Sequence, residues 1–215
     1  AKAKADLIVI SGAEGGTGAS PVSSMRFAGI SPEIGLAEAQ QTLVLNGLRD
    51  QVRLQTDGQL KTARDVIIMA MLGADEFSFG TLPLIVLGCL MMRKCNTNTC
   101  PVGVATQDET LRAKFRGRAE YVVNFFTFLA QQTREYLSEL GVRHLKDIIG
   151  RTDMIEVIPQ DKSSKLGTID FSRMLHRPDT DKALHWDRSE FTRVSGVKDE
   201  DIISVCEKAI ENKEE

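Results

Sequence analysis

The sequence lacks a long hydrophobic run. Its longest apolar stretch, Leu82 to Met92, is interrupted by Pro83 and Gly88 and is far shorter than the roughly 20 residues that a helix needs to cross a bilayer. The short apolar run from Leu7 to Ile10 is not followed by a small-residue cleavage site, so no secretory leader is indicated. We therefore expect a cytoplasmic protein with no membrane partner.

The sequence also lacks an excess of charge of either sign. The formal net charge is -3 at pH 7, and acidic and basic residues are interspersed along the chain. Nucleic-acid-binding domains usually concentrate Lys and Arg on one face, and no such concentration is present here. With 42% hydrophobic and 27% charged residues, the composition is that of an ordinary globular domain. Small molecules or other proteins are the expected partners.

Cysteine is scarce, but it is clustered. Three of the 4 cysteines, Cys89, Cys95 and Cys100, lie in one short segment that ends in Pro101. Thiolates are soft ligands that suit iron–sulfur clusters, and a Cys-Pro pair ends a common cluster-binding sequence. A cluster that lacks one corner iron needs three protein thiolates, so the count fits a 3Fe-4S cluster.

Two other interpretations of the cysteines stay open. Structural zinc would need a fourth Cys or His, whereas His144, His176 and His185 are remote in the sequence. The cysteines could also be buried residues without a ligand. Cys206 stands alone near the C-terminus and is interpreted as an ordinary apolar residue.

The order of elements predicts an α/β fold. Three short apolar segments, at residues 7–11, 52–56 and 76–79, each end in a glycine-containing loop and precede a helical pattern. Such a repeated order is typical of parallel strands with helical crossovers. Helices are expected at residues 36–48, 63–72 and 121–140, the last with Phe125, Phe126, Phe128 and Leu129 packed in the core.

Three glycine-containing loops are candidates for ligand binding. The segment from Ser11 to Pro21 contains four glycines, and such a loop often marks the close approach of a ligand; a flexible linker is the alternative. Gly58 and Gly80 follow the second and third strands, where backbone N–H groups could contact a phosphate. Taken alone, these two glycines are explained better as plain turns.

The pattern changes near Pro159. Beyond it, small residues, Pro178 and scattered charges predict an extended segment that lies on the surface. The last residues, Asp199 to Glu215, predict an acidic helix. We therefore divide the chain into residues 1–158, which carry the α/β units, and residues 159–215, an extended tail with a terminal helix.

Short stretches of the sequence, in order, match one known family. They are Ala3-Lys4-Ala5-Asp6, Gly15-Gly16-Thr17-Gly18-Ala19-Ser20-Pro21, Gly35-Leu36-Ala37-Glu38, Thr56-Asp57-Gly58, Phe79-Gly80-Thr81, Asn98-Thr99-Cys100-Pro101-Val102-Gly103-Val104, Val123-Asn124-Phe125-Phe126 and Ile149-Gly150-Arg151-Thr152-Asp153, with a weaker match at Gly167-Thr168-Ile169-Asp170. With these stretches the chain resembles the large ferredoxin- or NAD(P)H-dependent glutamate synthases.

The resemblance implies the C-terminal portion, about the last three β/α units, of a TIM (β/α)8 barrel with an iron–sulfur loop, a long helix and an extended tail. In this family 2-iminoglutarate, formed from 2-oxoglutarate and glutamine-derived ammonia, is reduced to L-glutamate at FMN, with electrons arriving through a 3Fe-4S cluster. Cys89, Cys95 and Cys100 would be the cluster ligands.

The resemblance also implies the flavin site. Asp57, Gly58, Gly80 and Thr81 would bind the FMN phosphate, and Gly15, Gly16 and Thr17 would line the flavin and substrate cavity. Gln59 stands where the family often has a second glycine, and Ala13-Glu14 stands for the frequent His-Asp. No catalytic side chain is assigned by these motifs.

Parts of the family's pattern have no counterpart in the sequence. Three strands cannot close an eight-stranded barrel, and the Lys-Pro-Gly-Glu-Gly-Gly-Gln-type segment associated with 2-oxoglutarate is absent. The chain alone is therefore expected to be inactive and to need the remaining barrel, a glutaminase portion, and ferredoxin or an NAD(P)H-oxidising subunit. The alternative is a non-catalytic iron–sulfur module for electron transfer or assembly, which would bind no flavin.

Overall fold

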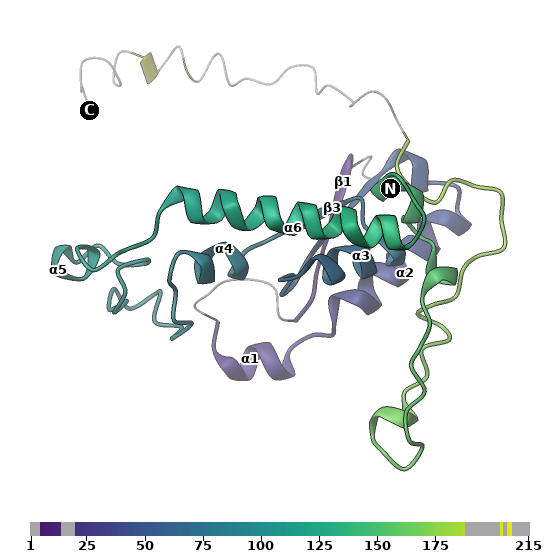
Figure 1. Cartoon of the computed structure of the whole chain (residues 1–215), viewed down its shortest axis with the longest axis horizontal. Helices are drawn as coiled ribbons and strands as arrows, with labels where there is room; N and C mark the ends of the chain where they lie inside the picture. Colours follow the sequence, from purple (N-terminus) through teal and green to yellow (C-terminus); the bar gives the residue numbers. More distant parts are fainter. Residues whose placement is uncertain (1–4, 14–19, 188–202, 204–205, 208–215) are drawn as a thin grey trace.

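The computed structural model describes residues 5–13, 20–187, 203 and 206–207 (Figure 1). A small parallel sheet in the order β1-β2-β3 is accompanied by helices. The strands are β1 (Leu7–Ser11), β2 (Arg53–Asp57) and β3 (Glu76–Ser78), and the α-helices are α1 (Val22–Phe27), α2 (Pro32–Leu45), α3 (Ala63–Leu72), α4 (Thr81–Val86), α5 (Glu109–Arg112) and α6 (Ala119–Glu139). Short 3-10 helices are η1 (Arg49–Gln51), η2 (Leu145–Ile148), η3 (Thr152–Met154) and η4 (Leu166–Thr168).

Local sequence explains where the main helices begin and end. Pro32 opens α2 in its first turn, a position where the missing N–H of proline costs nothing. Thr62 and Asp65 form a capping box at the start of α3, and Gly73 ends that helix with a φ of 122°, which favours glycine. The expected α3 is therefore confirmed residue for residue.

The two faces of the sheet differ in chemistry. Leu54 and Thr56 of β2 are buried on the face that α2 and α3 cover, where Ile8, Ile10 and Phe77 also contact the core. The opposite face carries mainly polar side chains from all three strands, and they bond across the strands: Ser11 to Asp57, Arg53 to Glu76, and Gln55 to Glu76. One face of the sheet is thus covered by helices, while the other is polar.

A second cluster of buried residues joins α3 to α6. Ile67, Ala70 and Met71 of α3 pack against Leu137 of α6 and against Ile148 and Ile149. Figure 1 shows α6 beginning on the side of α5 and running past α4 and α3. The edge-to-face contact of Phe126 with Phe79, at a ring-centroid distance of 5.2 Å, attaches the first half of α6 to the loop after β3.

Two sequence predictions need correction. Phe125, Phe126, Phe128 and Leu129 were expected in the core, but none of them is buried. Three are half-buried, and Phe128 is 70% exposed, because it lies on the face of α6 that no described element covers. The helix expected at residues 36–48 instead spans Pro32–Leu45. It begins earlier because Pro32 opens its first turn, and it ends earlier because Gly47 has a φ of 63°, which an α-helix cannot include. The expected helix at residues 121–140 and the three expected strands are confirmed within two residues.

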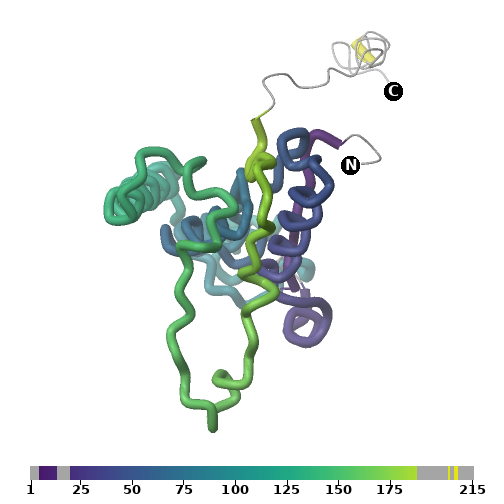
Figure 2. Tube along the Cα trace, turned by 90° about the vertical axis from the view of Figure 1, so that its right-hand side faces the viewer, coloured from purple at the N-terminus to yellow at the C-terminus, as the bar shows by residue number. Residues whose placement is uncertain are grey.

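The segment beyond Pro159 first projects as an arm and then returns to the body (Figure 2). On its return it lies along α2: Gln41 donates to the carbonyls of Arg173 and Met174, and Lys182 donates to the carbonyl of Leu45. We call residues 171–187 the strap. The division of the chain at residue 158 stays a prediction, and the acidic helix expected at residues 199–215 lies almost wholly outside the described residues.

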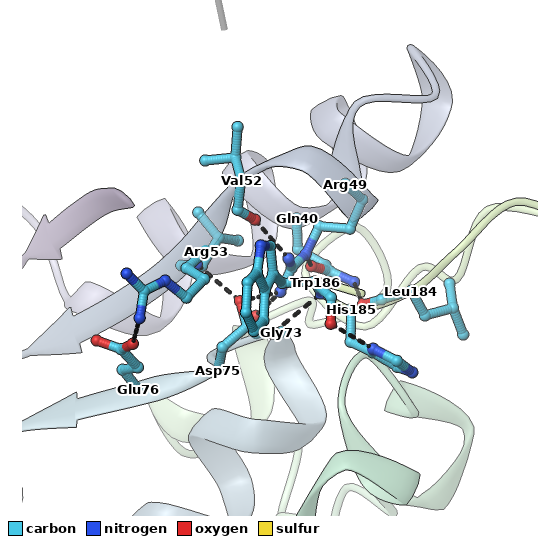
Figure 3. Close-up of polar contacts among 11 residues, drawn as sticks. Gln40, Arg49, Val52, Arg53, Gly73, Asp75, Glu76, Leu184, His185 and Trp186 are labelled. Carbon is cyan, nitrogen blue, oxygen red and sulfur yellow. Dashed lines mark hydrogen bonds and ion pairs between the residues drawn. The ribbon is translucent and has the colours of Figure 1, made fainter. Parts of the chain in front are cut away.

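A buried charged network holds the strap at the amino ends of the strands (Figure 3). Arg49, 1% exposed, donates to Asp75 at 2.7 Å and to the carbonyls of Val52 and Gly73. Asp75 also accepts from the backbone N–H groups of Leu54 and Trp186. Burial lowers the pKa of the Arg49 guanidinium, and the charge and hydrogen bond of Asp75 oppose that shift.

Three further contacts complete this network. Gln40 accepts from Arg49 and donates to the carbonyl of Leu184, so that a helix residue links the buried cation to the strap. The guanidinium of Arg53 lies 5.3 Å from the ring centroid of Trp186.

None of the described helices is long and apolar enough to cross a membrane.

Candidate functional site

The carboxyl ends of the three strands meet at one edge of the sheet. Ser11 pairs with Asp57 and Asp57 pairs with Ser78 in the parallel register. The Ser11 hydroxyl donates to the Asp57 carboxylate at 3.2 Å, and the N–H of Gly12 donates to the Asp57 carbonyl at 3.3 Å. The loops that the sequence singled out for ligand binding therefore start side by side.

A cavity of about 680 Å³ lies at this edge. We call it the large cavity. Its wall is formed by α1, by the first residues of α2, by residues 58–60 after β2 and by one side of α3, with Arg93 contributed from the cysteine segment. Its volume lies in the range of cofactor and small-molecule sites.

Gly58 is required by the backbone at this wall. Its φ is 137°, and a Cβ atom there would lie 2.9 Å from Cγ of Pro32. The next residue, Gln59, has a φ of 56°, a left-handed conformation that costs a non-glycine residue roughly 1–2 kcal/mol. The loop after β2 therefore keeps a backbone shape that suits two glycines, although only the first position has one.

The loop after β3 is more open. A Cβ atom at Gly80 would meet no atom within 4 Å, so there is room beside its backbone for a ligand. Gly80 and Thr81 are not part of the wall of the large cavity. Asp57 lies at the same edge through its pairing with Ser78. Gly15, Gly16 and Thr17, the third predicted set, lie outside the described residues.

The three clustered cysteines line one small cavity of about 20 Å³, which we call the cysteine cavity. Cys89 is half-buried, Cys95 is exposed and Cys100 is buried. Among the described residues, no three Cys, His, Asp or Glu side chains are close enough to hold a metal ion. Thiolates repel one another unless a cation lies between them, and metal binding commonly completes the folding of its own site.

Backbone N–H groups favour the ionised form of Cys100. The hydrogen bond from Ala105 is the main cause of its lowered pKa; the N–H groups of Val102, Gly103 and Val104 add to it, and burial opposes it. Donors arranged around a sulfur in this way stabilise a metal-bound thiolate.

The cysteine segment has an unusual backbone. Met91, Arg93 and Asn98 all have φ between 54° and 58°, and non-glycine residues in this region often mark functional loops. Asn98 holds the segment closed, because its side-chain oxygen accepts from the N–H of Gln107 at 2.6 Å and from the Thr106 hydroxyl at 3.0 Å.

Arg93 is the residue that sequence reasoning missed. It lines both the large cavity and the cysteine cavity. A cation two positions before Cys95 was visible in the sequence, but Lys94 offers the same signal, and only the fold distinguishes the two.

Comparisons with known proteins agree on one family. The conserved region of glutamate synthase matches residues 1–143. The chain is 53% identical over 180 residues to the glutamate synthase [NADPH] large chain of Bacillus subtilis, covering 83% of this chain and 12% of that protein. It is 59% identical over 158 residues to the corresponding large chain of Azospirillum brasilense, covering 74% and 10%.

A third relative is the ferredoxin-dependent glutamate synthase 2 of Synechocystis, which is 48% identical over 205 residues, covering 95% of this chain and 13% of that protein. The chain thus spans about an eighth or less of the length of these relatives. High identity over most of this sequence, in the segment that carries both cavities, leads to one conclusion. The chain belongs to the glutamate synthase family.

Proposed function

We propose that this chain provides the cluster-binding loop and part of the flavin-binding wall of a glutamate synthase. Cys89, Cys95 and Cys100 would hold a 3Fe-4S cluster in the cysteine cavity. The observation that carries the proposal is that all three cysteines line one cavity, and that this cavity shares Arg93 with the large cavity. The backbone donors around Cys100 fit a metal-bound thiolate.

We further propose that the sheet is a segment of a TIM (β/α)8 barrel. The helices α2 and α3 cover the same face of three parallel strands in sequential order, as on the outside of a barrel. The polar side chains of Arg53, Gln55 and Glu76 would then face its interior. In such barrels the active site lies at the carboxyl ends of the strands, the edge at which the large cavity opens.

FMN would lie at this edge, with its phosphate between the loops after β2 and β3. The backbone near Gly58 and Gly80 would donate hydrogen bonds to the phosphate, and the Asp57 side chain is kept at the edge by Ser11. When bound, FMN supplies the hydride chemistry that converts 2-iminoglutarate to L-glutamate. The part of the chain described here would orient the cofactor, while the residues that grip 2-oxoglutarate would come from another part of the protein.

The electron donor would be ferredoxin or an NAD(P)H-oxidising subunit. The relatives themselves are named as NADPH, NADH or ferredoxin-dependent enzymes, so the family alone does not choose between them. In each case electrons would enter through the cluster, and the glutaminase portion would supply ammonia.

The experiment is a pair of serine substitutions in the full natural protein that contains this sequence. Cys95 and Cys206 are both exposed thiols, so they form a matched pair. Cys95→Ser should remove most cluster iron and sulfide, because a hydroxyl is a poorer ligand for iron than a thiolate. Cys206→Ser should leave the cluster intact. Equal losses in both variants would reject the cluster assignment.

Flavin content separates the proposal from its alternative. Purified protein that contains FMN and the cluster supports the glutamate synthase function. A protein with the cluster but without FMN, even after FMN is added, would instead be an iron–sulfur module for electron transfer or assembly.

A further inference from the structure

Arg93 occupies the boundary between the two cavities. It contributes to the wall of each and follows Met92 in a segment whose backbone is left-handed at this residue, with a φ of 54°. This backbone shape turns the chain so that one residue can reach both spaces. The conformation is unfavourable for arginine, and such strain persists where the surrounding structure imposes it.

A hydrogen bond ties the guanidinium of Arg93 to the loop before α1. Its Nη1 donates to the carbonyl of Ser20 at 3.0 Å, and Ser20 lies two positions before Val22, a residue of the large cavity's wall. The side chain is half-buried. Among the described residues, no carboxylate forms an ion pair with it, so its charge is not neutralised by a neighbour in that part of the chain.

We propose that Arg93 is a positioning residue whose fixed charge raises the reduction potential of the iron–sulfur cluster. The inference rests on the proposed function, since it requires that the three thiolates hold a cluster. Cluster potentials depend on the net charge nearby and on solvent exposure. Each reduction adds a negative charge to the site, so a cation in its wall stabilises the reduced form more than the oxidised form.

The burial of Arg93 determines the size of the effect. Lys94 carries the same charge and also lines the cysteine cavity, but it is exposed and does not reach the large cavity. Water and salt screen exposed charges strongly, whereas partly buried charges are screened less. The charge of Arg93 should therefore affect the potential more than the charge of Lys94.

The test compares three variants of the full natural protein loaded with its cluster: Arg93→Gln, Arg93→Lys and Lys94→Gln. The readout is a redox titration followed by electron paramagnetic resonance, which needs no substrate. At the parent's midpoint potential, Arg93→Gln should lower the ratio of reduced to oxidised cluster roughly tenfold, the change that corresponds to about 59 mV in a one-electron couple. Arg93→Lys should stay close to the parent, and Lys94→Gln should change the ratio less than about threefold.

Several results would overturn the inference. They are an unchanged potential in Arg93→Gln, an equal change in Lys94→Gln, or a potential in Arg93→Lys as low as in Arg93→Gln. If Arg93→Gln fails to assemble a cluster, Arg93→Met is measured in its place. Failure of both neutral variants would make Arg93 a structural residue and refute its effect on the potential. A parent protein without a cluster would refute the proposed function instead.

Discussion

Asp75 is the acceptor on which the buried network at the amino ends of the strands depends. Its side chain is 9% exposed and accepts from Arg49 at 2.7 Å. It also accepts from the N–H of Leu54 at 2.7 Å and from the N–H of Trp186 at 3.2 Å. Asp75→Ala would therefore remove the counter-ion of a buried guanidinium and the acceptor of two backbone groups.

The expected loss of stability follows from these partners. Removing one member of a buried ion pair costs about 3–5 kcal/mol, because the other charge stays buried without compensation. Arg49 keeps three other acceptors, the carbonyls of Val52 and Gly73 and the Gln40 amide oxygen, so we expect about 3–4 kcal/mol. Asp153→Asn is the matched control, since it also removes a carboxylate charge from an ion pair with arginine. Because Asp153 is 39% exposed, this substitution should lower the free energy of unfolding by less than about 1 kcal/mol.

The chain contains a convenient reporter for this experiment. Trp186 is the single tryptophan, and it sits on the strap between Asp75 and Arg53. In Asp75→Ala, urea unfolding followed by tryptophan fluorescence should begin at lower urea than unfolding followed by far-ultraviolet circular dichroism, because the strap detaches first. A free energy of unfolding within about 1 kcal/mol of the parent, with coincident transitions, would refute the reasoning.

The remaining predictions concern the loops, the arm and the whole chain. Gln59→Gly should raise the free energy of unfolding by about 0.5–1 kcal/mol because it relieves a left-handed φ. Gln131→Gly, in the exposed middle of α6, should lower it by about 1 kcal/mol. If urea titrations show that both variants change the free energy of unfolding in the same direction, the loop geometry is contradicted. Gly80→Leu should leave the melting temperature unchanged, since its Cβ has open space, but should abolish FMN binding in the full protein; unchanged FMN affinity would reject the phosphate site. The hydrogen bond from Arg151, followed by the charges of Arg151 and Arg177, lowers the pKa of Asp153. The contribution of Asp153 to the free energy of unfolding is therefore complete above the unfolded pKa of about 3.9 and is lost as the pH falls through the lower folded pKa. When the free energy of unfolding is measured against pH, Asp153→Asn should lack this loss. Finally, the 215 residues supplied with FMN, ammonia, 2-oxoglutarate and a reductant should form no glutamate until the remaining barrel is added, and comparable formation without it would disprove the need for a partner segment.

The elements that the sequence predicted best are those whose limits are encoded locally. Helix α3 has its capping box and its final glycine at its own two ends, and the strands carry mainly apolar side chains at the positions that face the core. Phe128 illustrates the opposite case. Helical periodicity identifies an apolar side, but it does not reveal how far along the helix that side is covered, and the prediction for Phe128 was wrong for that reason.

The residues of the candidate site also differ in whether they can be recognised from local sequence or only from the fold. The three cysteines and Gly58 were proposed as site residues from residue type and spacing, which are local. Arg93 was missed because its position between the two cavities depends on a left-handed backbone and on a contact with Ser20, 73 positions away in the sequence. The network of Arg49 and Asp75 was missed as well, since a charged residue in a sequence is expected on the surface unless its partner is known.

The two ends of the strands have opposite energetic roles. Gln59, just after β2, and Met91 and Arg93, in the cysteine segment, hold left-handed backbones, each of which costs roughly 1–2 kcal/mol. At the amino ends, Asp75 fixes the strap to the sheet through bonds that the folded state alone can make. Strained loops persist only on a scaffold that is stable enough to impose them. The cysteine segment should therefore be sensitive to the strap: Asp75→Ala, although remote from the cysteines, should lower cluster occupancy at temperatures where the parent stays loaded, whereas Asp153→Asn should not. Equal occupancy in all three proteins up to the unfolding temperature would show that the two ends are energetically independent.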